Sequence, residues 1–282
     1  MAVFSAISVG SFMIPIKKAP KWPWENVWLV YSLFGLVVAP WVTAIITVPD
    51  ILVVFARSDG GILLMVFLFG LGWGFGSNLF GRGSSIIGVG LGFAITIGLL
   101  TGVGALVPLA MKPRILLTPS GLTVVGGVVL TLIGVAISGR AGMLKEAQDK
   151  KTLRAEAGIE KNESTSSYGK GLLYCLLAGV LLLPMLNFAF VFGEPIRNTA
   201  IAMGTSPVAA TDALWAVACL GGFLGNLLFL MQTFRKNKTW SAYRTSKAGI
   251  GHWVCGILMG VLWFGGVALY GRAAVLMGSL GA

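Results

Sequence analysis

The sequence predicts an all-α integral membrane protein, and three observations lead to this fold class. Of the 282 residues, 56% are hydrophobic and only 11% are charged, whereas a soluble domain carries about 25% charged residues. The mean hydropathy is +0.87. The apolar residues gather into long segments, and a helix needs about 20 such residues to cross a bilayer. A soluble enzyme, a disordered protein and a disulfide-rich scaffold are therefore excluded.

About eight transmembrane helices are expected, each in an apolar segment bounded by polar or turn-forming residues. The segments are residues 2–16, 26–48, 61–80, 85–111, 119–138, 170–193, 207–233 and 249–271. The first segment has no basic start and no cleavage site, so it is not a signal peptide. Residues 140–169 carry many charges, and we expect a solvated, partly helical linker there. This linker separates a first half, residues 1–139, from a second half, residues 170–282.

The basic residues predict the orientation of the chain. The net charge is +11, which in a soluble protein would suggest a nucleic-acid partner. Sixteen of the 21 basic residues instead fall in alternate loops, including Arg82 between the third and fourth segments and seven in or beside the linker. The positive-inside rule places these loops in the cytoplasm and the N-terminus outside. The remaining five lie in the opposite loops: Arg57, Lys112, Arg114, Arg197 and Arg272. No nucleic-acid partner is expected.

The sequence contains no residue pattern typical of an enzyme active site or a metal site. Cys175, Cys219 and Cys255 lie in apolar stretches without the spacing of a metal site, so we interpret them as packing residues. A single histidine and scattered acids form no catalytic constellation. No enzymatic activity, cofactor or metal is therefore expected.

An internal repeat appears when the sequence is shifted by 190 residues. Residues 68–82 then lie over 258–272 with seven of 15 positions identical, among them Trp73 over Trp263. The two segments are five crossings apart, which reverses their direction through the membrane, and such inverted repeats are typical of secondary transporters. By the same offset, partners for the fourth and fifth helices would end near residue 328, so we expect the last two helices to be lacking. Three alternatives remain: a fragment, helices supplied by a second copy or partner chain, or a coincidental repeat.

The N-terminal segments carry the most specific motif of the chain. It comprises Pro15-Ile16-Lys17-Lys18, Lys21-Trp22-x-Trp24-Glu25, Trp28, Pro40-Trp41 and Pro49. Further motifs are Gly70-x-x-Trp73-Gly74-x-Gly76, Gly81, Gly88, Gly92 and Arg140-Ala141-Gly142-x-Leu144-Lys145-Glu146. Weaker ones are Asn187-Phe188-Ala189, Pro195, Gly221-Gly222, Asn226, His252, Trp263 and Tyr270.

With these motifs the chain resembles the L-rhamnose–proton symporter family, a branch of the drug/metabolite transporter superfamily. The resemblance implies ten helices in two inverted five-helix halves, of which this chain would hold about eight. It also implies a bacterial inner-membrane protein that takes up a sugar together with a proton. Transport of a different sugar or small metabolite, and a non-transporting membrane fragment or subunit, stay open as alternatives.

Candidate substrate residues are the polar and aromatic side chains within apolar segments, because such polar groups are costly in lipid. Trp73 and Trp263 would form aromatic walls for a sugar, or simply fill space beside glycines. Asn78 and Asn226 each share a helix face with glycines, which favours either amide hydrogen bonds across a close helix contact or a substrate contact. Asn187 follows Pro184, and proline breaks often border transport sites. Tyr270 completes this set.

Candidate proton-coupling residues are few. Glu25 opens the second helix, where the helix dipole favours a carboxylate in any case. His252, the single histidine, begins the eighth helix near the cytoplasmic surface, and histidine is the residue type most often used for proton transfer near neutral pH. Glu194 and Asp212 border the outer loop between the sixth and seventh helices and could take a proton from outside.

Overall fold

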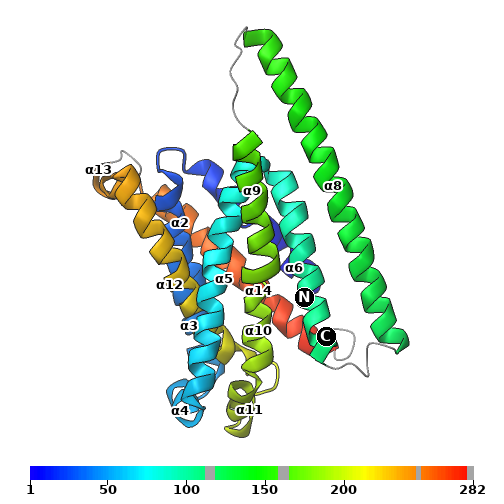
Figure 1. Cartoon of the computed structure of the whole chain (residues 1–282). Helices are drawn as coiled ribbons and strands as arrows, with labels where there is room; N and C mark the ends of the chain where they lie inside the picture. The colour runs from blue at the N-terminus through cyan, green and yellow to red at the C-terminus, as the bar shows by residue number, and fades with distance from the viewer. Residues whose placement is uncertain (112–117, 158–164, 246–248, 278–282) are drawn as a thin grey trace. The chain divides into compact units, whose positions relative to one another are not determined.

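The computed structural model describes residues 1–111, 118–157, 165–245 and 249–277. All regular structure in these ranges is helical, which confirms the predicted all-α class (Figure 1). The α-helices are α1 (Ala2–Ser11), α2 (Trp24–Leu33), α3 (Ala39–Thr47), α4 (Ile51–Arg57), α5 (Gly60–Ile87), α6 (Val89–Met111), α8 (Pro119–Ala157), α9 (Thr165–Leu177), α10 (Met185–Phe192), α11 (Glu194–Ala202), α12 (Thr211–Asn237), α13 (Ala242–Thr245) and α14 (Gly251–Met277).

Five helical stretches within the described residues are long and apolar enough to cross a membrane. They are Trp24–Thr47, Gly60–Ser84, Tyr168–Ala202, Thr211–Asn237 and Gly251–Ala273. Shorter apolar helices, Val3–Ile16, Leu91–Gly104 and Gly121–Ile137, fall in the three remaining expected segments. The chain is therefore a multi-pass membrane protein.

Two of the long stretches are interrupted by π-helical turns, and each turn stands just before a proline. The turn η2 (Phe34–Val38) precedes Pro40, and η3 (Ala178–Leu182) precedes Pro184. A proline ring clashes with the carbonyl four residues earlier, which lies inside the π turn in both cases. The wider turn is closed by bonds to the fifth residue back, such as Leu183 N–H to the Ala178 carbonyl at 2.8 Å. The break expected at Pro184 is thus confirmed.

Two predicted boundaries differ from the structure. Arg82, which was expected in a loop, lies inside α5, because the helix continues to Ile87. The turn comes at Gly88, whose φ of 97° is a conformation that glycine adopts without steric cost. The helix α8 likewise runs on to Ala157, so the first part of the linker is helical, as expected. Its Lys, Glu, Gln and Ala residues are good helix formers.

Packing divides the chain into two compact units. Unit 1 comprises residues 1–74 and 188–282, and unit 2 comprises residues 75–187. The chain passes between them within α5 and α10. In unit 2, α6 packs against α8 and α9 around a core of Ile87, Leu91, Ile95 and Cys175.

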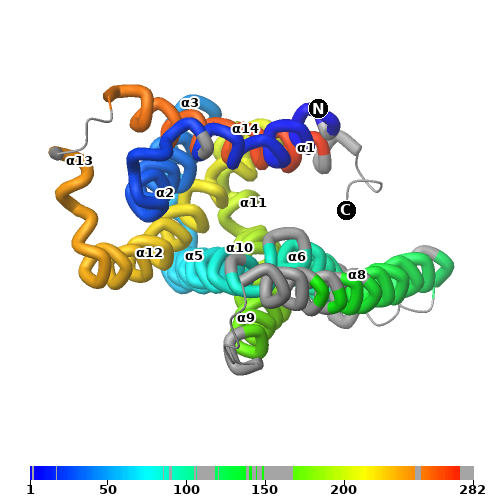
Figure 2. Tube along the Cα trace, turned by 90° about the horizontal axis from the view of Figure 1, so that it is seen from above, coloured from blue at the N-terminus to red at the C-terminus, as the bar shows by residue number. Residues whose placement is uncertain are grey.

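Unit 1 is held together by close helix contacts. The helix α1 lies along α14 (Figure 2), where Ser5 Oγ donates to the Gly266 carbonyl at 2.6 Å. On α5, a Cβ added at Gly70 or Gly74 would collide with backbone carbonyls of α12. The glycine-lined helix approach expected for this segment is therefore confirmed.

Candidate functional site

A row of five aromatic side chains runs through unit 1, and we call it the aromatic row. Trp24 stacks on Trp28 and Trp28 contacts Tyr31, each with ring centroids 4.8 Å apart. Tyr31 meets Trp263 edge-on at 6.4 Å, and Trp263 stacks on Trp73 at 5.5 Å. The row thus joins α2, α14 and α5 through contacts between aromatic rings.

Glycines make this arrangement possible. A Cβ added at Gly222 of α12 would lie 2.7 Å from the Trp73 ring, so the indole rests directly on this glycine. A Cβ at Gly35 would lie 3.1 Å from the Gly260 Cα, which lets α2 approach α14 closely enough for Tyr31 to reach Trp263. Larger side chains at these glycines would therefore disperse the row.

Polar groups lie beside the aromatic row. The indole Nε1 of Trp28 donates to Asn226 Oδ1 at 3.3 Å, an amide contact across helices of the kind expected for Asn226. Ser32 is fully buried, and its Oγ has no hydrogen-bond partner among the described residues. Ser32 lies one helical turn after Trp28 on the same side of α2, the side that contacts α12. Apolar faces with a few placed polar groups are the usual composition of a small-molecule site.

The predicted substrate residues are only partly brought together. Trp73, Trp263 and Asn226 meet in or beside the aromatic row. Tyr270 lies on α14 with 60% of its surface exposed, outside the row. Asn78, which is buried, and Asn187, which is exposed on α10, both belong to unit 2.

Sequence reasoning assigned no site role to three residues that the structure places here. Trp28 belongs to the N-terminal motif, whereas Tyr31 and Ser32 lie outside every motif of the sequence. Their spacing at i, i+3 and i+4 in a predicted membrane helix was the available signal, because it puts aromatic and hydroxyl groups on neighbouring faces.

Glu25 belongs to a hydrogen-bonded cluster at the start of α2. Its Oε1 accepts hydrogen bonds from Asn237 Nδ2 at 2.9 Å and from Thr239 Oγ1 at 2.8 Å. Tyr243 donates its hydroxyl to the Asn26 carbonyl at 2.9 Å. Burial raises the pKa of Tyr243, and the nearby Glu25 charge acts in the same direction, so this phenol keeps its proton.

His252 lies at the same end of unit 1 as Glu25. Its ring centroid is 5.6 Å from that of Trp22, which in turn contacts the ring of Tyr243 at 5.1 Å. The His252 Nε2 is buried and has no hydrogen-bond partner among the described residues. Two of the predicted proton-coupling residues therefore share one neighbourhood.

A second polar group lies at the other end of α12. Arg272 donates from Nη2 to Asp212 Oδ2 at 2.9 Å, and Thr47 Oγ1 donates to the same oxygen at 2.8 Å. Glu194, by contrast, is exposed at the start of α11. Of the two acids near this loop, Asp212 is the buried one.

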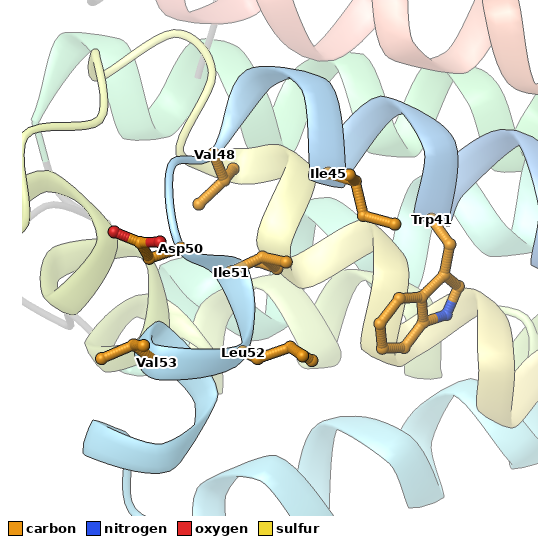
Figure 3. A pocket seen from close by; sticks show the side chains of 7 residues that line it. All are labelled: Trp41, Ile45, Val48, Asp50, Ile51, Leu52 and Val53. Atoms are coloured by element: carbon orange, nitrogen blue, oxygen red, sulfur yellow. The ribbon is translucent and has the colours of Figure 1, made fainter.

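A surface hollow of about 480 Å³ occupies the corner between α3 and α4. Figure 3 shows Trp41 at one end of its lining and Asp50 at the other, with aliphatic side chains between. One carboxylate in an otherwise apolar lining offers too few hydrogen bonds for a polyol. The aromatic row is therefore the better candidate for a sugar site.

Comparisons with known proteins identify the family of the chain. The family model of the L-rhamnose-proton symport protein (RhaT) matches residues 1–275. The L-rhamnose-proton symporter of Cronobacter sakazakii is 32% identical over 242 residues, which cover 85% of this chain and 67% of that protein. The protein of the same name from Escherichia coli is 30% identical over 269 residues, covering 93% of this chain and 75% of the relative. No solved structure matches the chain. The chain therefore belongs to the L-rhamnose-proton symport protein family.

Proposed function

We propose that this protein is a secondary active transporter that takes up L-rhamnose together with a proton by alternating access. The observation that carries the proposal is the aromatic row, which lies within unit 1 beside the Asn226 amide and the Ser32 hydroxyl. Family membership supports the same conclusion, since relatives in this family are named L-rhamnose-proton symporters.

The chemistry of the row suits a deoxy sugar. L-rhamnose carries a methyl group in place of a hydroxymethyl group, so it combines an extended apolar face with several ring hydroxyls. Trp73 and Trp263 offer flat faces for the C–H side of the ring, and Ser32 and Asn226 offer hydrogen bonds to hydroxyls. Asn78, Asn187 and Tyr270 stay further candidates for substrate contacts.

An inverted repeat with halves at residues 1–139 and 170–282 is part of the proposal. Two features support it. The repeat-related Trp73 and Trp263 stack on each other, as expected of equivalent residues near a pseudo-twofold axis. Glycine contacts also join α5 to α12 and α14 to α2, and under the 190-residue offset these two helix pairs are equivalent.

The orientation follows from the basic residues. With 16 of 21 basic residues in or beside the alternate connections between the expected apolar segments, the linker at residues 140–169 is cytoplasmic and the N-terminus is outside. A phosphatase fused within the linker is then inactive, and an active fusion would overturn this topology. In this orientation the Glu25 and His252 neighbourhood lies at the cytoplasmic end of unit 1.

Proton release is assigned to that cytoplasmic end. Glu25 is a buried carboxylate bonded to the turn that follows α12, and His252, which contacts Trp22, has a buried nitrogen without a partner among the described residues. Glu194 is the exposed acid on the other side, where it would meet protons from outside.

The test is transport by the purified chain in proteoliposomes. We expect uptake of radiolabelled L-rhamnose when the outside is acidic, and abolition of accumulation by a protonophore. L-mannose, which differs by one hydroxyl at carbon 6, should compete more weakly. Absence of L-rhamnose uptake under any pH gradient would overturn the proposal, and uptake of another sugar alone would reassign the substrate.

A further inference from the structure

A buried ion pair joins three helices of unit 1 at the end opposite Glu25. Asp212 lies in the first turn of α12, Arg272 in the last part of α14 and Thr47 at the end of α3. The side chain of Asp212 is 2% exposed and that of Arg272 is 29% exposed. Because α12 has 27 residues, about 40 Å of helix separates this ion pair from the cluster around Glu25.

The ion pair is incompletely bonded. Arg272 Nη2 and Thr47 Oγ1 both donate to Oδ2 of Asp212, whereas Arg272 Nε is buried and has no partner among the described residues. An arginine–carboxylate pair often forms two parallel bonds. Here only one such bond joins the two side chains, and the arginine is already partly exposed. The guanidinium can therefore move into water at the loss of a single hydrogen bond to Asp212.

The charged groups around Asp212 leave Arg272 as its counterion. The helix α3, which packs on α12, carries no titratable side chain. The helix α11 carries the exposed Glu194 and Arg197, and Arg197 donates to the Pro207 carbonyl at 3.4 Å. Farther along this end lie the exposed acids Asp50 and Asp59, and Arg57 on α4. Among the described residues, Asp212 and Glu25 are the two buried carboxylates.

Protonation of Asp212 would remove the charge attraction between Asp212 and Arg272. The attraction between a carboxylate and a guanidinium is strong in a low-dielectric interior, and a buried charge that loses its partner is strongly destabilised. A proton from outside neutralises the carboxylate, so Arg272 loses its counterion and is better solvated in water. The ion pair that ties α14 to α12 then weakens.

We propose that Asp212 binds the proton that accompanies the sugar at the outer end of unit 1, and that this protonation separates Arg272 of α14 from Asp212 of α12 and opens that end. When the proton leaves Asp212, the ion pair with Arg272 reforms and this end closes again. This inference rests on the proposed function as a proton-coupled sugar transporter. It assigns the outer proton-binding role to the buried Asp212 ahead of the exposed Glu194.

The transport test compares three isosteric variants in proteoliposomes. We expect Asp212→Asn to lower pH-driven accumulation of L-rhamnose about tenfold or more, and to keep L-rhamnose counterflow at equal pH within about threefold of wild type. Asp59→Asn is the matched control, because Asp59 is exposed and caps α5 through a bond from Ile62 N–H that Asn can also accept. Full pH-driven accumulation by Asp212→Asn, or its loss in Glu194→Gln alone, would overturn the inference.

A second measurement needs no sugar, and it tests the proposal even if the Asp212→Asn variant folds poorly. Ala210, which is fully buried just before α12, is changed to Cys and labelled with a membrane-impermeant maleimide. We expect labelling to rise as the pH falls, and Arg272→Gln to move this rise to higher pH, because the bond between Arg272 and Asp212 no longer holds this end closed. Arg272→Lys keeps the pair and should keep the profile. A profile that Arg272→Gln leaves unchanged would overturn the inference. If L-rhamnose uptake is absent but this shift is seen, the proposed substrate fails and the proton switch stands.

Discussion

The indole rings of Trp73 and Trp263 stack with their centroids 5.5 Å apart and their planes 27° from parallel, although 190 residues separate them in the chain. These two residues align in the internal repeat, and together they form the inner end of the aromatic row. Their contact therefore connects the repeat seen in the sequence with the site proposed for the sugar.

Removal of either indole should weaken sugar binding. We expect Trp73→Ala and Trp263→Ala each to raise the Kd for L-rhamnose about tenfold, since an aromatic face contributes about 1 kcal/mol or more. The double variant should lose less than the sum, because each ring positions the other. Equilibrium binding to the solubilised protein measures both effects. Trp41→Phe, in the hollow between α3 and α4, is the control and should bind L-rhamnose normally. If Trp41→Phe weakens binding and the Trp73 and Trp263 variants do not, the sugar site lies in that hollow.

The hydroxyl of Ser32 should separate stability from binding. Ser32→Ala removes a buried hydroxyl that has no partner among the described residues, so the sugar-free protein should be as stable as wild type or up to about 1 kcal/mol more stable. Sugar affinity should fall about fivefold through loss of one hydrogen bond. Thermal denaturation and sugar binding measure the two quantities. Ser11→Ala serves as control, because that hydroxyl bonds locally to the Ser8 carbonyl. Unchanged affinity in Ser32→Ala would exclude the hydroxyl from the site.

The packing of α5 on α12 depends on Gly70. A Cβ there would collide with the Ala218 carbonyl, so Gly70→Ala should destabilise the protein by about 1–3 kcal/mol. Gly81→Ala in the same helix meets nothing within 4 Å and should be neutral or stabilising by about 0.5–1 kcal/mol through helix propensity. Thermal denaturation in detergent distinguishes the two variants. Equal effects would show that the close helix contact contributes little.

Glu25 has a structural role and a proposed proton role, and two substitutions separate them. Glu25→Ala leaves Asn237 and Thr239 without their acceptor and should cost about 1–3 kcal/mol of stability. Glu25→Gln keeps a carbonyl oxygen for both donors and should remain close to wild type in stability. If Glu25 carries a proton, Glu25→Gln nevertheless loses pH-driven accumulation. A stable Glu25→Gln that accumulates L-rhamnose normally would leave the residue a structural role only.

The phenol of Tyr243 predicts a loss of stability at alkaline pH. Burial raises its pKa above the ordinary value of 10.0, so the fold favours the protonated form. This contribution is complete below pH 10 and is lost as the pH rises above it. The thermal midpoint of wild type should therefore fall above pH 10. Tyr243→Phe loses the bond to the Asn26 carbonyl at every pH and should show a flatter alkaline profile; an equally steep decline would assign the pH dependence to other groups.

Much of the fold could be predicted because membrane insertion selects for local hydropathy. The helical stretches long and apolar enough to cross a membrane fall largely within predicted apolar segments, Glu25 lies in the first turn of α2, and the glycines of α5 mark a close helix contact. The position of the turn at Gly88 was missed because the polar residues before it are compatible with a helix. A positive φ at Gly88, and not the end of the apolar run, decides where α5 stops.

The site was predictable only in part. Trp73, Trp263 and Asn226 stood out as polar or aromatic residues in apolar segments, and these three do meet in or beside the aromatic row. Tyr270 stood out for the same reason and lies exposed on α14. Hydropathy does not indicate which face of a helix meets another helix, so it could not distinguish these cases.

By itself, the sequence determined the all-helical membrane class, the approximate helix positions, the uneven distribution of basic residues and the family. Only the tertiary structure decided that Tyr31 meets Trp263, that Ser32 lies buried without a partner among the described residues, and that Asp212 is paired with Arg272. The physical reason is the range of the interactions. Partition into lipid depends on a residue and its near neighbours in the chain, whereas stacking, ion pairing and burial depend on helices that are brought together by packing.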